Sequence, residues 1–304
     1  MSTPGSGPNG SAEPLKVVNA FTVDVEDYFQ VEAFKGVVDP SGWDARPSRV
    51  VTNTERVLAI LRAADVRATF FVLGWVAERF PSLVRNIHAG GHEIASHGYA
   101  HQAAHTQTAA EFREDVRRAK AILENCAGQR VRGFRAPTFS ITRSNWWAYE
   151  VLAEEGYDYS SSIYPIAHDL YGIPDAPRTP FKPLADTGFL EIPVATLRLL
   201  GKNRPCGGGG YFRLLPYPVS RWCIDRTNRH DGLACVFYCH PWEFDPEQPR
   251  VSSISMKSRF RHYLNIDKME GRAERLLGDF AWTRMDALFL ESPMLRGQEA
   301  PVWN

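Results

Sequence analysis

Short apolar runs alternate along the chain with longer stretches in which apolar residues recur every three or four positions. The short runs are typical of buried strands, and the three-to-four-residue period is typical of helices. Strands are predicted at residues 17–25, 68–73, 93–96, 132–135, 157–160, 189–194 and 236–238. Because strands and helices alternate, the pattern predicts βα units and a parallel sheet.

The intervening helices carry recognisable start and stop signals. Thr52–Glu55 and Thr108–Glu111 both have the form of a capping box, in which an N-terminal Thr and a Glu three residues later satisfy free backbone N–H groups. The pair Gly90-Gly91 predicts a helix end. Further helices are predicted at residues 144–154 and 268–277. The expected fold is a distorted (β/α) barrel of about seven parallel strands.

The pattern loosens between residues 161 and 218, where Pro is frequent. Long irregular segments in compact domains often cover an active site, so we expect irregular lid loops here. Residues 1–15 are rich in Gly, Pro and Ser and predict a disordered leader. The expected division is therefore a leader, a barrel over 16–245, and a helical C-terminal extension over 246–304 that packs on the barrel.

Composition restricts the classes of partner. The 304 residues include 44% hydrophobic ones, enough for one large core, and 35 basic residues balance 35 acidic ones. Without a basic excess, nucleic-acid binding is not expected. The sequence shows no transmembrane segment and no secretory signal, which predicts a cytoplasmic protein. The five cysteines show no CxxC spacing and are expected to be buried thiols.

Polar residues follow several of the predicted strands. Asp24, Glu26 and Asp27 crowd together after the first strand, where three buried carboxylates would repel one another without a cation. His97 and His101 are four residues apart, a spacing that lets two imidazoles face one divalent ion. The ends of parallel barrel strands meet on one face, so these groups predict a metal-assisted hydrolase.

Two later residues complete this constellation. Arg135 follows a strand and precedes Ala-Pro, and we expect its guanidinium to orient a catalytic carboxylate through a bidentate pair. His240 ends the most hydrophobic late strand, in the sequence His-Pro-Trp-Glu, and is placed to act as a general acid.

Taken in order, the motifs resemble those of the polysaccharide deacetylases with a NodB-type domain, a carbohydrate esterase family 4-like group. The matching segments are Thr-Val-Asp-x-Glu-Asp, Ser-His-x-x-x-His, Phe-Arg-Ala-Pro, Tyr-Asp-Tyr-Ser-Ser and His-Pro-Trp-Glu. The Val-Asp-Val-Glu-Asp-Tyr-Phe and Gly-Gly-Gly-Tyr-Phe-Arg segments are similar to the subgroup found in exopolysaccharide gene clusters of the exosortase type.

The resemblance implies roles for single residues. Asp24 corresponds to the catalytic base, and Glu26 to the acidic metal ligand, with Asp27 as a substitute. His97 and His101 correspond to the histidine ligands. Arg135 corresponds to the residue that tunes the base and His240 to the general acid, while Asp158 matches the residue that tunes this histidine.

The implied reaction removes acetyl groups from N-acetylated sugars of a polysaccharide or its precursor. One divalent ion, Zn²⁺ or alternatively Co²⁺, would activate water, and a backbone N–H at Thr138 would help hold the oxyanion. Candidate sugar-stacking side chains are Tyr99, Phe139, Tyr211 and Trp242. Residues 207–210 are four glycines that either approach a flat sugar chain or form a flexible loop, and they are not expected to open a helix.

Two other functions remain open at this point. The same barrel also occurs in metal-independent cyclic-amide hydrolases, and the altered first motif allows that activity. A catalytically silent glycan-binding module is the second alternative.

Overall fold

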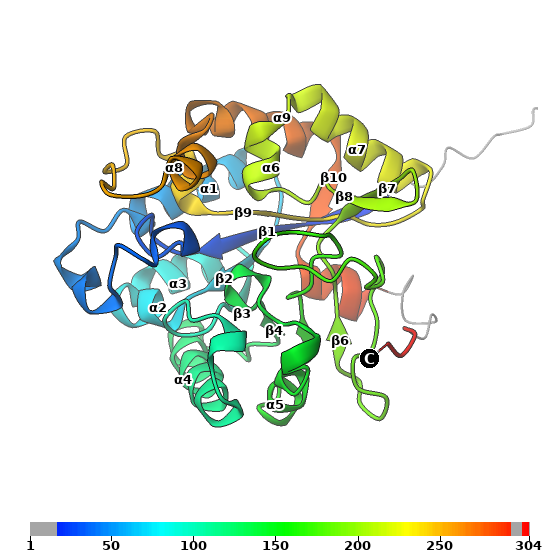
Figure 1. Ribbon diagram of the computed structural model, residues 1–304, viewed down its shortest axis with the longest axis horizontal. Coiled ribbons are helices and arrows are strands. Elements are labelled where there is room, and N and C mark those ends of the chain that lie inside the picture. Colours follow the sequence, from blue (N-terminus) through cyan, green and yellow to red (C-terminus); the bar gives the residue numbers. More distant parts are fainter. Residues whose placement is uncertain (1–16, 293–299, 304) are drawn as a thin grey trace, which may run out of the picture.

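In the part of the chain that the structure describes, eight parallel strands form one large sheet (Figure 1). The computed structural model describes residues 17–292 and 300–303, so the expected leader lies outside the described residues. The strand order is β10–β1–β2–β3–β4–β5–β6, and β9 pairs separately with β1. The strands are β1 (Val18–Val25), β2 (Thr69–Val72), β3 (Glu93–Ser96), β4 (Gly133–Phe134), β5 (Tyr159–Ser160), β6 (Leu190–Glu191), β9 (Val236–Cys239) and β10 (Ala281–Thr283).

The sheet curls so that its β6 and β9 sides approach each other. The backbone N–H of Ala195, shortly after β6, donates to the carbonyl of Val236 in β9, and Tyr238 N–H donates to Gly207. These bonds bridge the gap that the regular strands leave. The expected α/β architecture, a distorted barrel of parallel strands, is thus confirmed.

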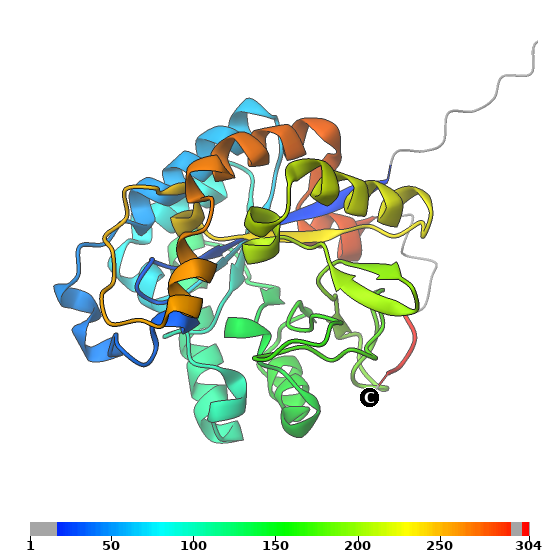
Figure 2. The same cartoon turned by 45° about the horizontal axis from the view of Figure 1, so that its top comes forward.

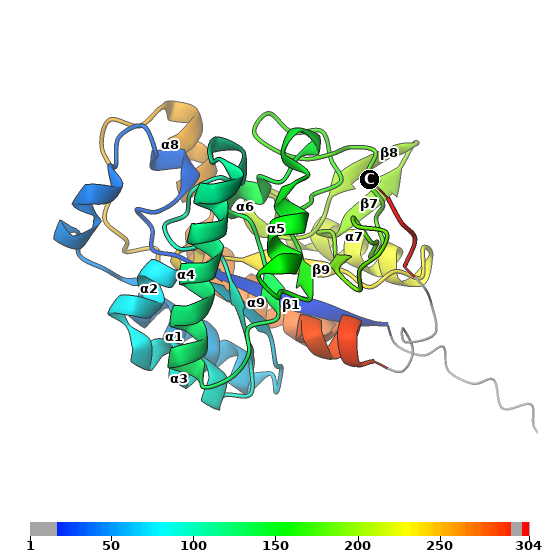
Figure 3. The ribbon, with the colours of Figure 1, turned by 90° about the horizontal axis from the view of Figure 1, so that it is seen from below.

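Helices cover the outside of the curled sheet. In Figure 1 the early helices α2 to α5 lie below β1, and α6, α7 and α9 lie above it. Figure 2 brings the upper helices forward, and Figure 3 shows α4 and α5 from below. The helices are α1 (Val50–Ala63), α2 (Gly74–Arg79), α3 (Pro81–Ala89), α4 (Ala109–Ala127), α5 (Ala148–Glu154), α6 (Gly209–Leu214), α7 (Tyr217–Arg229), α8 (Met256–Tyr263) and α9 (Met269–Asp279).

One predicted helix start is confirmed and the other is wrong. Thr108 and Glu111 form the expected capping box of α4. Helix α1, however, begins at Val50 and not at Thr52. Its first N–H groups are satisfied by Asp27, whose carboxylate accepts hydrogen bonds from the backbone N–H groups of Arg49 at 2.9 Å and Val50 at 3.2 Å. A distant side chain therefore sets the helix start, which local pattern cannot show.

The segment after β9 contributes to the sheet. Strand β10 pairs with β1 at residues 18–20, and β2 pairs with the same strand further along, at residues 22–25. A β-hairpin of β7 (Thr196–Leu199) and β8 (Lys202–Pro205) stands apart from the main sheet. The predicted domain division at residue 245 stays a prediction.

Two smaller expectations can be compared with the described residues. All five cysteines are free thiols, and four of them are buried. Among the described helices, none combines the length and the apolar character required to span a bilayer.

Candidate functional site

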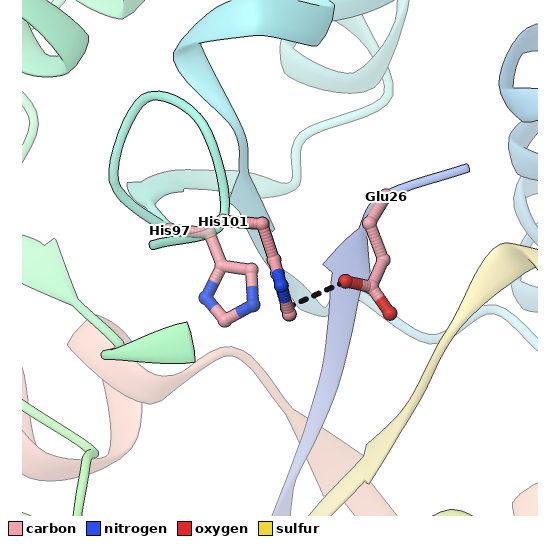
Figure 4. Close-up of side chains that lie close together, drawn as sticks. All are labelled: Glu26, His97 and His101. Carbon is pink, nitrogen blue, oxygen red and sulfur yellow. Dashed lines mark ion pairs between the residues drawn. The ribbon is translucent and has the colours of Figure 1, made fainter. Parts of the chain in front are cut away.

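Glu26, His97 and His101 converge at the carboxyl-terminal edge of the sheet (Figure 4). Each offers one ligand atom, and these atoms lie within 4.8 Å of one another. Glu26 follows β1 directly, and His97 follows β3, which is separated from β1 in the sheet by β2 alone. The convergence therefore results from strands whose carboxyl ends share one edge.

A tight turn brings the two histidines together. Gly98 has a φ of +75°, and His101 itself has a φ of +51°, both in the left-handed region. The ring centroids of the two histidines are 5.4 Å apart. His97 Nδ1 lies 2.8 Å from the carbonyl oxygen of Arg135, to which it donates as the N–H tautomer. This bond leaves His97 Nε2 with a free lone pair, as a metal ligand requires.

The donor set fits a divalent cation. Glu26 Oε2 is buried, contacts His101 Nε2 at 2.7 Å and accepts no hydrogen bond of good geometry. Burial raises the pKa of Glu26, but the nearby histidines lower it by a larger amount. The pKa of Glu26 therefore lies well below its usual value. Burial lowers the pKa of His97 to about 4, so its imidazole is neutral. Two imidazoles and an ionised carboxylate are a donor set that zinc binds in catalytic sites.

Asp27 does not belong to this cluster, which corrects its prediction as a substitute ligand. Its carboxylate accepts hydrogen bonds from Ser48 Oγ and from the backbone N–H groups of Tyr28, Arg49 and Val50. These bonds occupy the carboxylate in capping α1, on the opposite side of the chain from Glu26.

Asp24 lies beside the three ligand residues and is held by Arg135, as expected. Arg135 Nη1 donates to Asp24 Oδ1 at 2.7 Å and to Thr22 Oγ1 at 2.7 Å. The guanidinium is 0% exposed and also donates to Ser161 through Nε and Nη2. The contact with Asp24 uses one nitrogen and is therefore not the bidentate pair expected. Asp24 Oδ2 stays free of Arg135 and faces His240.

His240 approaches the site from β9, which pairs with the other side of β1. Its Nε2 is 4.0 Å from Asp24 Oδ2 and 3.8 Å from Glu26 Oε1. Its Nδ1 lies 3.2 Å from Glu243 Oε2, which also accepts the backbone N–H of His240. Burial lowers the pKa of His240, but this hydrogen bond and the charge of Glu243 outweigh it and raise the pKa to about 9.

Glu243 is in turn paired with Arg213 in the interior. Arg213 Nε donates to Glu243 Oε1 at 2.6 Å, and the two side chains are 2% and 0% exposed. Arg213 also donates to the backbone carbonyls of residues 261, 262 and 264 at the end of α8. Burial raises the pKa of Glu243, yet Arg213 and His240 lower it to about 2, so Glu243 is ionised.

The predicted role of Asp158 is wrong. Its carboxylate pairs with Arg130 at 2.6 Å and with Arg132 at 2.7 Å, at the amino-terminal side of β5. This is the opposite end of the strand from the edge at which the metal ligands meet. Glu243, only three residues from His240, makes the contact that had been assigned to Asp158.

The predicted substrate-contacting residues divide into three groups. Thr138, Phe139 and Trp242 line the cavity of 170 Å³ that contains the candidate catalytic groups. Tyr211 lines the neighbouring cavity instead. Tyr99 lies elsewhere, because its hydroxyl donates to Glu78 and its ring packs under the guanidinium of Arg118.

Trp242 makes a contact that its predicted stacking role did not include. Its indole Nε1 donates to Glu26 Oε1 at 3.0 Å. The ring is stacked between His240, at 5.1 Å, and the buried His262 of α8, at 4.2 Å. Trp242 therefore fixes the orientation of the Glu26 carboxylate, a candidate metal ligand.

Three of the four glycines pack closely against the protein, and Gly210 lines the cavity that also contains Tyr211. Gly208 has a φ of +115°, and a side chain there would place its Cβ 2.0 Å from the carbonyl oxygen of Tyr238 in β9. Gly209 starts α6, so the expectation that the glycines open no helix is wrong. Their small size lets α6 approach β9 closely, which brings Arg213 within reach of Glu243.

The main residues missed from the sequence are Glu243, Arg213 and His262. Glu243 and Arg213 stand in motifs that the sequence had singled out, His-Pro-Trp-Glu and Gly-Gly-Gly-Tyr-Phe-Arg. The three-residue separation of His240 and Glu243 was a usable signal, since residues at that spacing in a tight turn contact each other. No comparable signal in the sequence points to His262.

Residues 42–159 match the family model described as "Polysaccharide deacetylase". Over these residues the chain is similar to the polysaccharide deacetylase family. Residues 161–290 match a second model, described as "Domain of unknown function (DUF3473)". The exopolysaccharide-associated subgroup stays a prediction.

Individual relatives that the chain matches are also named deacetylases. The chain is 35% identical over 98 residues to a peptidoglycan-N-acetylglucosamine deacetylase of Bacillus cereus, covering 32% of this chain and 36% of that protein. It is 36% identical over 119 residues to a chitooligosaccharide deacetylase of Sinorhizobium fredii, covering 36% of this chain and 53% of that protein. The chain thus spans about a third to a half of the curated relatives that it matches.

A solved structure supports the fold over the whole length. A crystal structure from Mycobacterium smegmatis, named for the same family, superposes with a TM-score of 0.62 at 22% sequence identity. The superposition covers 100% of this chain and 97% of the other. The shared fold therefore includes both the segment of residues 42–159 and the segment of residues 161–290.

Proposed function

We propose that this protein is a metal-dependent deacetylase that removes acetyl groups from N-acetylated sugars of a polysaccharide or its precursor. The observation that carries the proposal is the meeting of Glu26, His97 and His101 at one buried point, with Asp24 and His240 beside them. The named relatives act on peptidoglycan and chitooligosaccharides, which supports an N-acetylated glycan as the substrate.

Glu26, His97 and His101 are the residues that would hold the ion, for which Zn²⁺ is the first candidate and Co²⁺ the second. When bound, such an ion polarises the acetyl carbonyl and lowers the pKa of water. The orphaned Glu26 Oε2 and the free Nε2 of His97 support this assignment.

Asp24 and His240 divide the proton transfers between them. Arg135 holds Asp24 Oδ1, which leaves Oδ2 free to take a proton from the attacking water. Glu243 holds the Nδ1 side of His240, so Nε2 faces the cavity and can give its proton to the departing amine nitrogen. Thr138, in the cavity wall at a φ of +57°, remains our proposed backbone donor to the oxyanion.

Acetate release from an N-acetylated chitooligosaccharide tests the proposal. The wild type should release acetate, lose this activity on chelation and regain it with zinc. Asp24→Asn should lower kcat by about a hundredfold or more, because general-base catalysis contributes that much. Asp65→Asn, at an exposed carboxylate distant from the site, is the matched control and should behave as the wild type.

The same experiment separates the alternatives. Full activity in metal-free protein would favour a metal-independent amide hydrolase. Glycan binding without acetate release, unchanged in Asp24→Asn, would favour a silent binding module.

Two finer proposals do not rest on the geometry of the site. The first is a role in exopolysaccharide biosynthesis, which deletion of the gene and analysis of the secreted glycan test. The second is a cytoplasmic location, which cell fractionation tests.

A further inference from the structure

A second cavity opens directly beside the catalytic one. It measures about 330 Å³ and shares Leu170, Tyr171 and Tyr238 with the catalytic cavity. We call it the α8 groove, because Phe260, Arg261 and other residues of α8 form one of its walls and Leu214 of α6 forms another. A ligand in this groove therefore lies next to whatever occupies the catalytic cavity.

The α8 groove exposes aliphatic and aromatic side chains to solvent. Leu170, Leu214 and Phe260 are 53%, 47% and 57% exposed, and Met256, one helical turn before Phe260, is 89% exposed. Single exposed apolar residues are ordinary, but a contiguous set marks a binding surface. Aliphatic side chains gain little from a hydroxyl-covered sugar ring, whereas a hydrocarbon chain would bury them.

Two cations stand in the same groove. Lys257 Nζ lies 2.6 Å from Asp169 Oδ2, and Arg261 lies 3.3 Å from the same carboxylate. Two positive charges thus share one negative charge, and both side chains stay largely solvent-accessible. The remaining positive charge is suited to a phosphate, which Arg and Lys bind through charge-assisted hydrogen bonds.

The groove is built only from the region that matches the domain of unknown function. Every lining residue lies between His168 and Leu264, within the matched residues 161–290. The metal ligands come from earlier in the chain. The later region therefore adds a binding surface to a catalytic centre whose metal ligands come from outside that region.

We propose that the α8 groove binds the hydrocarbon chain and phosphate of a lipid-linked sugar, whose acetylated ring occupies the catalytic cavity. This rests on the proposed deacetylase function and names its substrate class. Apolar walls, a cationic rim and continuity with the catalytic cavity together match an amphiphile of this kind. A purely glycan ligand would leave the aliphatic side chains without a partner.

Binding can be measured without catalysis. Isothermal titration calorimetry with farnesyl phosphate, with inorganic phosphate as comparison, reports the groove alone. The wild type should bind farnesyl phosphate at least about tenfold more tightly than inorganic phosphate, since each 1.4 kcal/mol of apolar burial is tenfold. The double variant Phe260→Ser with Leu214→Ser should lose this difference. Leu200→Ser, at a residue 92% exposed on the β7–β8 hairpin, is the matched control and should keep it.

Activity then tests the link to the substrate. We compare kcat/KM for N-acetylglucosaminyl-diphospho-farnesol with that for tetra-N-acetylchitotetraose. The ratio of the two values should fall about tenfold in the Phe260/Leu214 double variant and remain unchanged in Leu200→Ser.

Three results would overturn the proposal. The first is equal affinity of the wild type for farnesyl phosphate and inorganic phosphate. The second is an equal fall, in the double variant, of the kcat/KM values for both substrates. This result would make the α8 groove a sugar subsite. The third is a double variant whose kcat/KM ratio is unchanged but which no longer binds vesicles of phosphatidylglycerol. This result would make the α8 groove a membrane-docking surface. If neither substrate releases acetate, the proposed deacetylase function is wrong. Calorimetry alone then tests whether the α8 groove binds a lipid phosphate.

Discussion

The buried pair of Arg213 and Glu243 leads to a sharp prediction for Glu243→Gln. The substitution keeps the size of the side chain but removes its charge. Glu243 accepts hydrogen bonds from Arg213 on one oxygen and from the backbone N–H of His240 on the other. A glutamine has a single acceptor oxygen, so one of these donors would face an NH₂ group.

The expected cost follows from burial. Exposed ion pairs contribute little, but removing one partner of a buried pair costs about 3–5 kcal/mol. The two side chains are 2% and 0% exposed, so the larger figure applies. Unfolding entropy of about 2.1 cal/mol/K per residue converts this loss into a Tm roughly 5–8 °C lower for a chain of 304 residues.

The variant should also lose activity, because Glu243 orients the proposed general acid. We expect kcat for acetate release to fall at least about tenfold with little change in KM. Thermal unfolding followed by circular dichroism measures the Tm, and both readings are compared with Glu247→Gln, an exposed carboxylate in the same loop. A Tm and a kcat equal to those of the control would refute both the buried-pair argument and the role of Glu243.

Three further predictions address other parts of the structure. Trp242→Phe removes the N–H donor to Glu26 but keeps an aromatic ring, and should weaken metal affinity by about tenfold to a hundredfold in a competition titration with a chelator. Burial lowers the pKa of His92 to about 4, because the folded protein favours the neutral imidazole. The contribution of His92 to the free energy of unfolding is therefore complete above about pH 6.5 and is lost as the pH falls through 4. As the pH falls between these values, the free energy of unfolding measured in urea should therefore decrease less for His92→Gln than for the wild type. Parallel curves of this free energy against pH would contradict the prediction. Gly208→Ala should lower the Tm by several degrees, whereas Gly210→Ala, whose Cβ would meet only Arg213 Nη2 at 4.0 Å, should not.

The sequence predicted the parts of the site that strand periodicity controls. Asp24 is one of the last two residues of β1, and four further residues directly follow strand ends: Glu26, His97, Arg135 and His240. The carboxyl ends of parallel strands share one edge of the sheet. Their meeting could therefore be anticipated from the order of strands alone.

Prediction from the sequence failed where a side chain contacts a distant segment of the chain. Asp27 sits beside Glu26 in the chain, but it caps a helix that begins 23 residues later. Asp158 was selected by motif order, yet it lies at the wrong end of its strand. Arg213 contacts Glu243 only because glycines allow α6 to approach β9. None of these contacts has a periodic or local signature.

The arrangement also shows why neither matched segment is a complete site. Residues 42–159 hold His97, His101 and Arg135 but not the carboxylates of β1, and residues 161–290 hold His240 with its supporting Glu243. The two halves meet because β9 pairs with β1 in register over residues 20–23, which brings His240 Nε2 to 4.0 Å from Asp24. The pairing of β1 with β9 thus brings the proposed base and the proposed acid together, so the proposed reaction depends on it as much as the fold does.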